Sequence, residues 1–189
     1  MMNVFESGII LWIQENIRGP IGNVFWQFIT HLGDEGYLWI AMGIILLFFK
    51  KTRPVGFTVL VALLFDFLTI NVVLKGLVAR PRPFVVNELI EPLVGGVSPY
   101  RSFPSGHSGG SFAAMFALYR WVPKKIGVPA LFLATLVALS RLYVGVHYPT
   151  DIVGGFIIGF ICSALAYAVV KMVICRRENK KNGGVIGEN

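Results

Sequence analysis

Long apolar runs separated by short polar stretches make up most of the chain. A helix needs roughly 20 mainly apolar residues to cross a bilayer, with some latitude for tilt and for neighbours that shield polar groups. Five segments meet this requirement, at residues 36–49, 55–78, 105–121, 126–142 and 149–175. The pattern therefore predicts an all-α integral membrane protein whose five transmembrane helices form a single bundle.

The N-terminal segment has a less regular pattern. Residues 3–32 contain the break Gly19-Pro20 and offer no uninterrupted apolar stretch long enough to span a membrane. We expect interfacial helices on the outer surface, and we keep open a six-helix alternative in which this segment crosses as a broken helix. The expected organisation is N-terminal interfacial helices over 1–35, a transmembrane bundle over 36–176 and a basic cytoplasmic tail over 177–189.

Composition supports a membrane location. The chain has 189 residues, of which 55% are hydrophobic and only 14% are charged, and its mean hydropathy is +0.69. Charged residues are too sparse to cover a soluble globule of this length. The net charge of +7 could indicate binding to nucleic acid, but the basic residues form short clusters between apolar runs. We therefore expect membrane lipids, and no nucleic acid, as partners.

The basic clusters also predict the orientation, because short cytoplasmic loops are enriched in Lys and Arg. One cluster lies at residues 50–53, a second at 120–125 and a third at 171–181. If the five segments alternate in direction, all three clusters fall on one side, which we assign to the cytoplasm. The loops 79–103 and 141–148 then share the outer face.

Both expected outer loops carry reactive polar residues beside helix ends. Lys75 and Arg82 are seven positions apart, so they share a face if the helix persists to Pro81 and converge if it unwinds. The second cluster, Pro-Ser-Gly-His at 104–107, opens a helix, where free backbone N–H groups and the positive end of the helix dipole favour an anion.

The third cluster spans the last outer loop. Ser140 and Arg141 end one helix, and His147 follows in the loop. Pro149 suits the first turn of the last helix, so Asp151 lies just inside that helix, four residues from His147.

Taken together, these clusters resemble the signature of the type 2 phosphatidic acid phosphatase family, which shares its core with bacterial acid phosphatases and vanadium haloperoxidases. The signature elements are K-x6-R-P, matched by Lys75, Arg82 and Pro83; P-S-G-H, matched by residues 104–107; and S-R-x5-H-x3-D, matched by Ser140, Arg141, His147 and Asp151. Every defining position is filled, in the family's order, over about residues 70–155. The chain departs from many members at its N-terminus, where six spans are usual and only five are evident here.

The resemblance implies a role for each reactive residue. His147 would attack phosphorus and form a phosphohistidine that water later hydrolyses. Asp151 would fix the tautomer of His147 and stabilise its developing charge. His107 would protonate the leaving oxygen and then act as base on the hydrolytic water.

The same resemblance implies a phosphate-binding set. Lys75, Arg82 and Arg141 would hold the non-bridging oxygens, and Ser105 with the Gly106 amide would add hydrogen bonds at the helix start. This scheme requires no metal and no other cofactor. The sequence also lacks HExxH and any cluster of acids near the motifs.

Four further polar residues have no role in the motifs. For Arg80 and Arg101, an outer-surface contact or pairing with lipid headgroups competes with substrate binding. For His31 a structural or interfacial role is expected. Asp66 lies in the middle of a span, where a carboxylate costs roughly 2.5 to 3.5 kcal/mol, so it should face the bundle interior or be protonated.

The resemblance to short bacterial members with an Ile-Thr-His-Leu-Gly segment implies a phosphatase that converts undecaprenyl diphosphate to the monophosphate at the outer face. Phosphatidylglycerophosphate and phosphatidate are the alternative substrates. A non-catalytic protein that binds or translocates lipid is a different class, and the complete set of reactive residues argues against it. The oligomeric state does not follow from the sequence.

Overall fold

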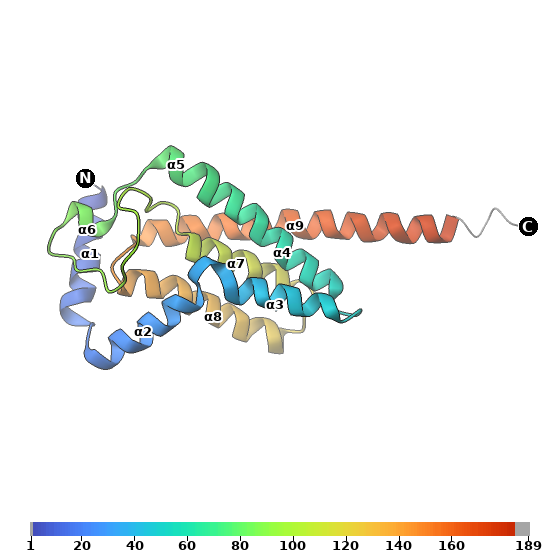
Figure 1. Cartoon of the computed structure of the whole chain (residues 1–189), viewed down its shortest axis with the longest axis horizontal. Helices are drawn as coiled ribbons and strands as arrows, with labels where there is room; N and C mark the ends of the chain where they lie inside the picture. Colours follow the sequence, from blue (N-terminus) through green and yellow to red (C-terminus); the bar gives the residue numbers. More distant parts are fainter. Residues whose placement is uncertain (1, 184–189) are drawn as a thin grey trace, which may run out of the picture.

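The protein is a bundle of helices from which one long helix extends (Figure 1). The structure, a computed structural model, describes residues 2–183. Its main helices are α1 (Met2–Asn16), α2 (Pro20–Leu32), α3 (Tyr37–Phe48), α4 (Arg53–Phe67), α7 (Gly106–Tyr119), α8 (Lys124–Tyr143) and α9 (Pro149–Gly183). Shorter elements join them: the 3-10 turn η1 (Asp34–Gly36), the π-helix η2 (Leu68–Leu74), α5 (Lys75–Val78) and α6 (Pro83–Val86). No strand occurs between residues 2 and 183, which agrees with the predicted all-α class.

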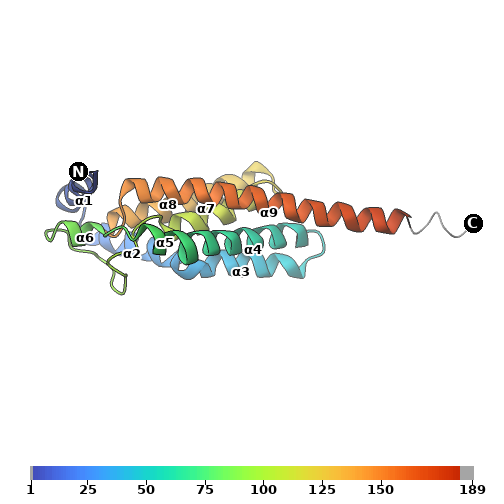
Figure 2. The same cartoon turned by 90° about the horizontal axis from the view of Figure 1, so that it is seen from above.

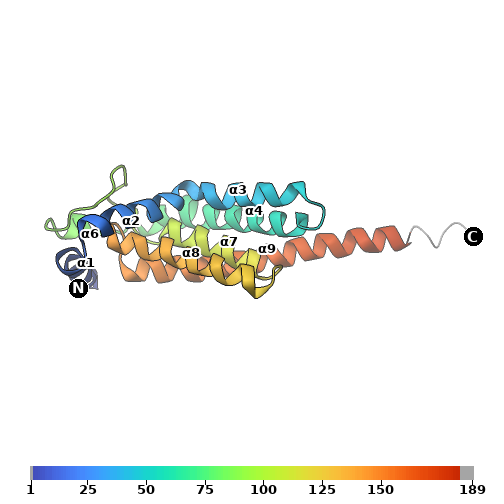
Figure 3. The ribbon, with the colours of Figure 1, turned by 90° about the horizontal axis from the view of Figure 1, so that it is seen from below.

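Helix α7 lies inside the bundle, where it packs against α4, α8 and α9 (Figures 2 and 3). Its contact with α9 depends on glycine. A Cβ atom added to Gly155 would lie 2.6 Å from the carbonyl oxygen of Ser105, and one added to Gly159 would lie 2.5 Å from that of Gly109. The absence of side chains lets the two backbones touch, so α9 is held against the first turns of α7.

The five segments predicted from hydropathy are helical, and α9 continues beyond its predicted end into the expected tail. Three stretches are long and apolar enough to cross a membrane: Arg53–Val86, Lys124–Tyr143 and Pro149–Lys180. Helix α7 has 14 residues, or about 21 Å, which is less than the roughly 30 Å of a hydrocarbon core. Most of α7 is buried among its neighbours, and the number of transmembrane helices stays a prediction.

The N-terminal helices differ from one another in their placement. Helix α1 lies across the end of the bundle where α7 begins (Figure 1). Helix α2 packs along α8, with Trp26 stacked on Tyr143 at 5.5 Å between ring centroids, and it exposes Ile21 and Phe28 on its other face. Together with Asp34–Phe48 it forms a fourth candidate span, bent by 42°. The expected boundary at residue 35 therefore falls inside a bent unit of α2, η1 and α3.

The two ends of the bundle differ in charge and in chemistry. The α3–α4 loop, the α7–α8 loop and the C-terminal part of α9 lie at one end (Figure 1), and the basic clusters at 50–53, 120–125 and 171–180 lie there with them. The loops that carry the three motifs lie at the opposite end. This arrangement is the one expected from helices that alternate in direction.

Candidate active site

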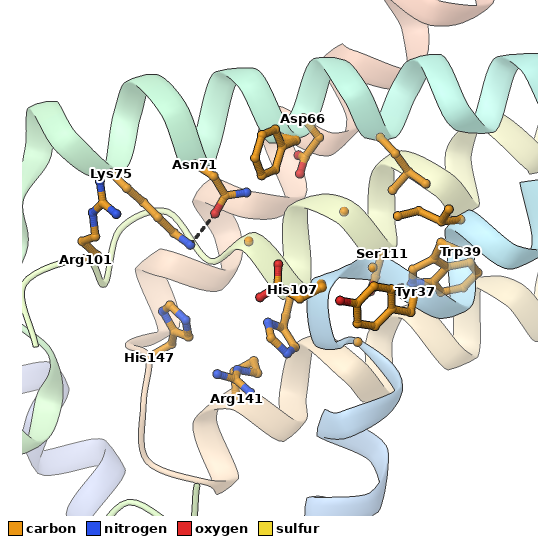
Figure 4. A pocket seen from close by; sticks show the side chains of 18 of the residues that line it. Tyr37, Trp39, Asp66, Asn71, Lys75, Arg101, His107, Ser111, Arg141 and His147 are labelled. Atoms are coloured by element: carbon orange, nitrogen blue, oxygen red, sulfur yellow. Dashed lines mark hydrogen bonds between the residues drawn. The ribbon is translucent and has the colours of Figure 1, made fainter. Parts of the chain in front are cut away.

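A cavity of about 730 Å³ brings the three motifs together. One end is lined by Lys75, Arg82, His107, Arg141 and His147. The other end is lined by apolar side chains of α3 and α4, among them Trp39, Leu60, Leu63, Leu64 and Phe67. Leu64 and Phe67 are about half exposed on the bundle surface, so the cavity joins a cationic chamber to an apolar opening between α3 and α4 (Figure 4).

His147 and Asp151 form a buried pair at the cationic end. The Nδ1 atom of His147 lies 3.2 Å from Oδ2 of Asp151, as the four-residue spacing predicts, and both side chains are almost completely buried. If Asp151 accepts the Nδ1 proton, the lone pair is on Nε2. That Nε2 atom is 3.2 Å from Nη1 of Arg82, which lines the same cavity.

Burial lowers the pKa of the His147 imidazole to about 3, because a charged ring would lose its hydration. The hydrogen bond that His147 donates to Asp151 opposes this change, whereas the nearby charges of Arg82 and Arg141 add to it. His147 is therefore neutral at physiological pH, which is the form that has a nucleophilic lone pair.

The carboxylate of Asp151 is itself held by several donors. Ser102 donates its hydroxyl proton to Oδ2 at 2.5 Å, and the backbone N–H of Tyr148 donates to the same oxygen at 2.9 Å. Arg80 donates from Nη1 to Oδ1 at 2.6 Å. These contacts fix the carboxylate in the plane where it meets His147.

Arg80 belongs to a buried ionic network, which corrects both of the roles expected from the sequence. Its second guanidinium nitrogen pairs with Glu6 on α1, and its guanidinium carbon lies 4.0 Å from the ring centroid of Tyr148. Glu6 also accepts hydrogen bonds from the backbone N–H and the hydroxyl of Thr150. Arg80 thus contacts protein groups inside the structure and connects α1 to Asp151.

Lys75 and Arg82 meet in the cavity because the helix unwinds between them. Helix α5 ends at Val78, and Ala79 adopts a left-handed conformation with φ of 44°. Arg82 is then held by the carbonyl groups of Ser98 and Val146, each at 2.7 Å. The predicted convergence of the two cations is therefore confirmed for the case in which the helix unwinds.

The π-helical segment η2 directs the side chains of Lys75 and Asn71 toward the cavity. In a regular α-helix, a residue five positions along lies about 140° round the axis. The wider turn of η2 changes this phase, so that Asp66 and Asn71, five residues apart, both line the cavity. Lys75 donates to the Asn71 side-chain oxygen at 2.7 Å (Figure 4). Asp66 faces the interior as expected, and its Oδ1 atom is buried without a partner among the described residues.

Arg141 is nearly fully buried and lacks a complete set of acceptors. Its Nη1 donates to the hydroxyl of Thr30 at 2.6 Å, while its Nε has no partner within residues 2–183. A buried guanidinium N–H without an acceptor is costly, and an anion in the cavity would supply one. Arg101 also lines this chamber, near Lys75 in Figure 4, which agrees with the substrate-binding alternative for this residue.

Only some of the residues at the start of α7 line the cavity. Gly106 and His107 line it, and a Cβ atom on Gly106 would lie 3.2 Å from Nζ of Lys75. Ser105 does not line it: the hydroxyl is fully buried and accepts a hydrogen bond from the backbone N–H of Ser108 at 3.3 Å. Ser105 therefore acts as the N-cap of α7 and shapes the site through the helix start.

His107 has a carboxylate partner that the motifs do not include. Its Nε2 lies 2.9 Å from Oδ1 of Asp34 in η1, and the other oxygen of Asp34 lies 2.7 Å from Nδ1 of His31. His31 is largely exposed, and the structural or interfacial role expected for it stays a prediction.

Comparisons with known proteins identify this constellation. Residues 53–175 match the PAP2 superfamily. The chain belongs to this superfamily. An undecaprenyl-diphosphatase of Sulfolobus acidocaldarius is 34% identical over 145 residues, covering 75% of this chain and 68% of that protein. Phosphatidylglycerophosphatase B of Bacillus subtilis is 35% identical over 158 residues, covering 77% and 73%. The crystal structure of Aquifex aeolicus LpxE has a TM-score of 0.76 at 27% identity, covering 88% of this chain and 94% of that one.

Membership confirms the resemblance drawn from the motifs. PAP2 enzymes hydrolyse phosphate esters, and this chain is a multi-pass membrane lipid phosphatase of the PAP2 superfamily. The named relatives act on different lipids, so the comparisons establish the reaction class and leave the lipid to a proposal.

Several residues that contact the site lie outside the PAP2 motifs and are not predicted by the sequence. Thr30 contacts Arg141, Asp34 contacts His107, and Glu6 contacts Arg80. Each pair joins residues at least 70 positions apart, which no local pattern reveals. The one available signal was the polar segment Thr-His-Leu-Gly-Asp between two apolar runs, at residues 30–34.

Proposed function

We propose that the protein hydrolyses undecaprenyl diphosphate to undecaprenyl phosphate through a phosphohistidine at His147, on the outer face of the cell membrane. The observation that carries this proposal is the single cavity in which a neutral, buried His147 and several cations adjoin an apolar opening on the bundle surface. Such a cavity suits an amphiphile with an anionic head and an apolar chain.

In the first step the Nε2 lone pair of His147 attacks the terminal phosphorus, and the bond from phosphorus to the bridging oxygen breaks. Asp151 accepts the Nδ1–H hydrogen bond and stabilises the positive charge that develops on the ring. His107, on another side of the chamber, gives its proton to the leaving oxygen.

In the second step His107 accepts a proton from water, and the resulting hydroxide attacks the phosphohistidine. The N–P bond breaks, inorganic phosphate is released, and both histidines return to their starting states. Charge on the non-bridging oxygens is held by Lys75, Arg82 and Arg141, assisted by the N–H of Gly106.

This scheme requires no metal ion or cofactor, because the nucleophile, the acid and the charge stabilisers are all side chains. Among the residues that the structure describes, no group of three His, Cys, Asp or Glu side chains could hold a metal ion. A protein that only binds or moves lipids would need the cations, but it would have no use for a histidine–aspartate pair beside a second histidine.

The choice of undecaprenyl diphosphate is supported by the Sulfolobus acidocaldarius relative and by a chamber with enough cations for two phosphate groups. Phosphatidylglycerophosphate is the second candidate, supported by the Bacillus subtilis relative; phosphatidate is a third. An outward-facing site is supported by the basic clusters at the opposite end of the bundle, which favour a cytoplasmic location for that end.

Phosphate release from purified protein in detergent tests this proposal. We expect the highest kcat/KM for undecaprenyl diphosphate, followed by phosphatidylglycerophosphate and phosphatidate. The His147→Ala variant should lose turnover on all three, because the covalent route is closed. Faster hydrolysis of phosphatidylglycerophosphate would replace the proposed substrate, and substantial turnover by His147→Ala would refute the proposed nucleophile.

A further inference from the structure

The bend between α2 and α3 contacts the site at two points. Thr30, in the last turn of α2, accepts a hydrogen bond from Arg141, and Asp34, in η1, contacts His107. Gly33 lies between them, and a Cβ atom there would be 2.8 Å from the His107 ring. This segment lies outside the residues 53–175 that match the PAP2 superfamily, so its contacts are additions to the motif residues.

We propose that Asp34 is the positioning residue of His107, so that the site contains two aspartate–histidine pairs. The inference rests on the general-acid role of His107 in the proposed function. One oxygen of Asp34 lies 2.9 Å from Nε2 of His107. With Nε2–H donated to this carboxylate, Nδ1 is the ring nitrogen that exchanges a proton with the leaving oxygen.

The charges around His107 explain why such a partner matters. Lys75 and Arg141 line the same chamber as His107, and both disfavour a positive charge on its ring. Arg82, Arg101 and His147 line it as well, and Glu35 and Asp66 are the acidic groups on its wall. Asp34 is the carboxylate in hydrogen-bonding contact with His107, so it stabilises the imidazolium form that a general acid must reach.

The two pairs differ in burial, and the difference suits their tasks. Asp151 and His147 are fully enclosed, which keeps the nucleophile neutral, whereas the side chain of Asp34 is 44% exposed. An exposed carboxylate keeps its charge readily. Its second oxygen lies 2.7 Å from Nδ1 of His31, but this pair is largely exposed and contributes little to the position of the carboxylate.

The test compares two leaving groups in the Asp34→Asn variant, which keeps the size of the side chain and removes its charge. Phosphatidate releases an alkoxide that needs a proton, whereas p-nitrophenyl phosphate releases a stable phenolate. We expect kcat for phosphatidate to fall on the order of 10- to 100-fold, a part of the roughly 10² to 10⁴ that acid–base catalysis contributes. For p-nitrophenyl phosphate, kcat should change by less than about threefold, and KM should be unchanged for both.

The pH profile gives a second readout. Without the carboxylate, the limb of kcat/KM on which His107 loses its proton should move to lower pH. Asp34→Glu, which keeps the charge, should retain more activity on phosphatidate than Asp34→Asn. His31→Gln is the matched control, because it changes the other partner of Asp34, and His31 has no hydrogen bond with His107. Its kcat on each of the two substrates should stay within about twofold of the value for the natural protein.

Parallel measurements on His107→Gln separate this inference from the proposed function. If His107→Gln loses equal activity on both substrates, the general-acid role itself is wrong. If His107→Gln is selective for phosphatidate but Asp34→Asn is not, the positioning role of Asp34 is refuted alone. A double-mutant cycle gives a third readout: losses on phosphatidate that multiply independently contradict the proposal, and a double variant Asp34→Asn with His107→Gln that is no worse than His107→Gln supports it. Should Asp34→Asn fold poorly, Asp34→Ser takes its place in the same cycle.

Discussion

Replacing Arg80 with methionine tests how far the nucleophile depends on helix α1. Methionine keeps most of the apolar stem and removes the guanidinium between Glu6 and Asp151, whose side chains are 5% and 0% exposed. Removing one partner of a buried ion pair costs about 3 to 5 kcal/mol, because the remaining charge is left unpaired. Here two carboxylates lose the same cation, so we expect a value within or above this range.

Thermal unfolding in detergent, followed by tryptophan fluorescence, measures this cost. For a chain of this size, 1 kcal/mol corresponds to roughly 2 to 4 °C in Tm, so Arg80→Met should unfold about 6 to 20 °C below the natural protein. Below that temperature, phosphate release should continue at a reduced rate, because the pair of His147 and Asp151 is still present. Asp151 keeps the hydrogen bonds from Ser102 and Tyr148, which still orient it toward His147.

Arg177→Met, at an exposed position on α9, is the matched control and should change neither quantity. The double variant Glu6→Leu with Arg80→Met should be more stable than Arg80→Met alone, since one of the two unpaired carboxylates is gone. An Arg80→Met variant with the natural Tm and the natural kcat would refute the view that this network holds the nucleophile pair.

Three further predictions concern pH, topology and metal ions. Because burial lowers the pKa of His147 to about 3, the acidic limb of kcat/KM should lie below about pH 5, well under the ordinary histidine value of about 6.5. The same shift should lower the free energy of unfolding as pH falls from about 6.5 toward 3, because only the unfolded chain binds the proton in that range; His147→Ala should flatten this slope. In a variant with Cys162 and Cys175 replaced by serine, a cysteine at Gly95 should react with an impermeant maleimide on intact cells, whereas one at Lys125 should not; the reverse pattern would place the site in the cytoplasm. Finally, EDTA should leave phosphate release largely unchanged, and a loss restored only by added metal would require a different mechanism.

Hydropathy was sufficient to predict the helical bundle, and motif spacing was sufficient to predict which residues gather at one end of it. Apolar runs must be helical in a membrane because their backbone groups find no other partners there, so α3, α4, α7, α8 and α9 could be placed from the sequence, whereas the short α6 in the expected outer loop could not. The seven-residue spacing of Lys75 and Arg82 left two geometries open. The left-handed residue Ala79 decides between them, and it carries no strong sequence signal because alanine rarely adopts that conformation.

Contacts between distant segments could not be predicted in the same way. Arg80 was expected either at the outer surface, where a cation usually finds water or headgroups, or in contact with the substrate. Its actual partner, Glu6, lies 74 positions away, in a segment for which the sequence predicts only an interfacial helix. The π-helical turn η2 could not be predicted either, because it changes the face of the helix on which each residue lies and leaves the apolar composition of the segment unchanged. Ser105 shows the converse: local helix chemistry predicts its capping role better than the family signature does.

The shape of the cavity also bears on how a turnover ends. With about 730 Å³ shared between a polar and an apolar end, there is room for a head group and the first part of a chain, while a long prenyl tail has to remain among the bilayer lipids. The enzyme would then never lift its substrate out of the membrane. Inorganic phosphate is released at the cationic end and the shortened lipid withdraws from the apolar end, so the two products leave opposite ends of the cavity. Rates should accordingly depend weakly on tail length once the tail exceeds the depth of the opening.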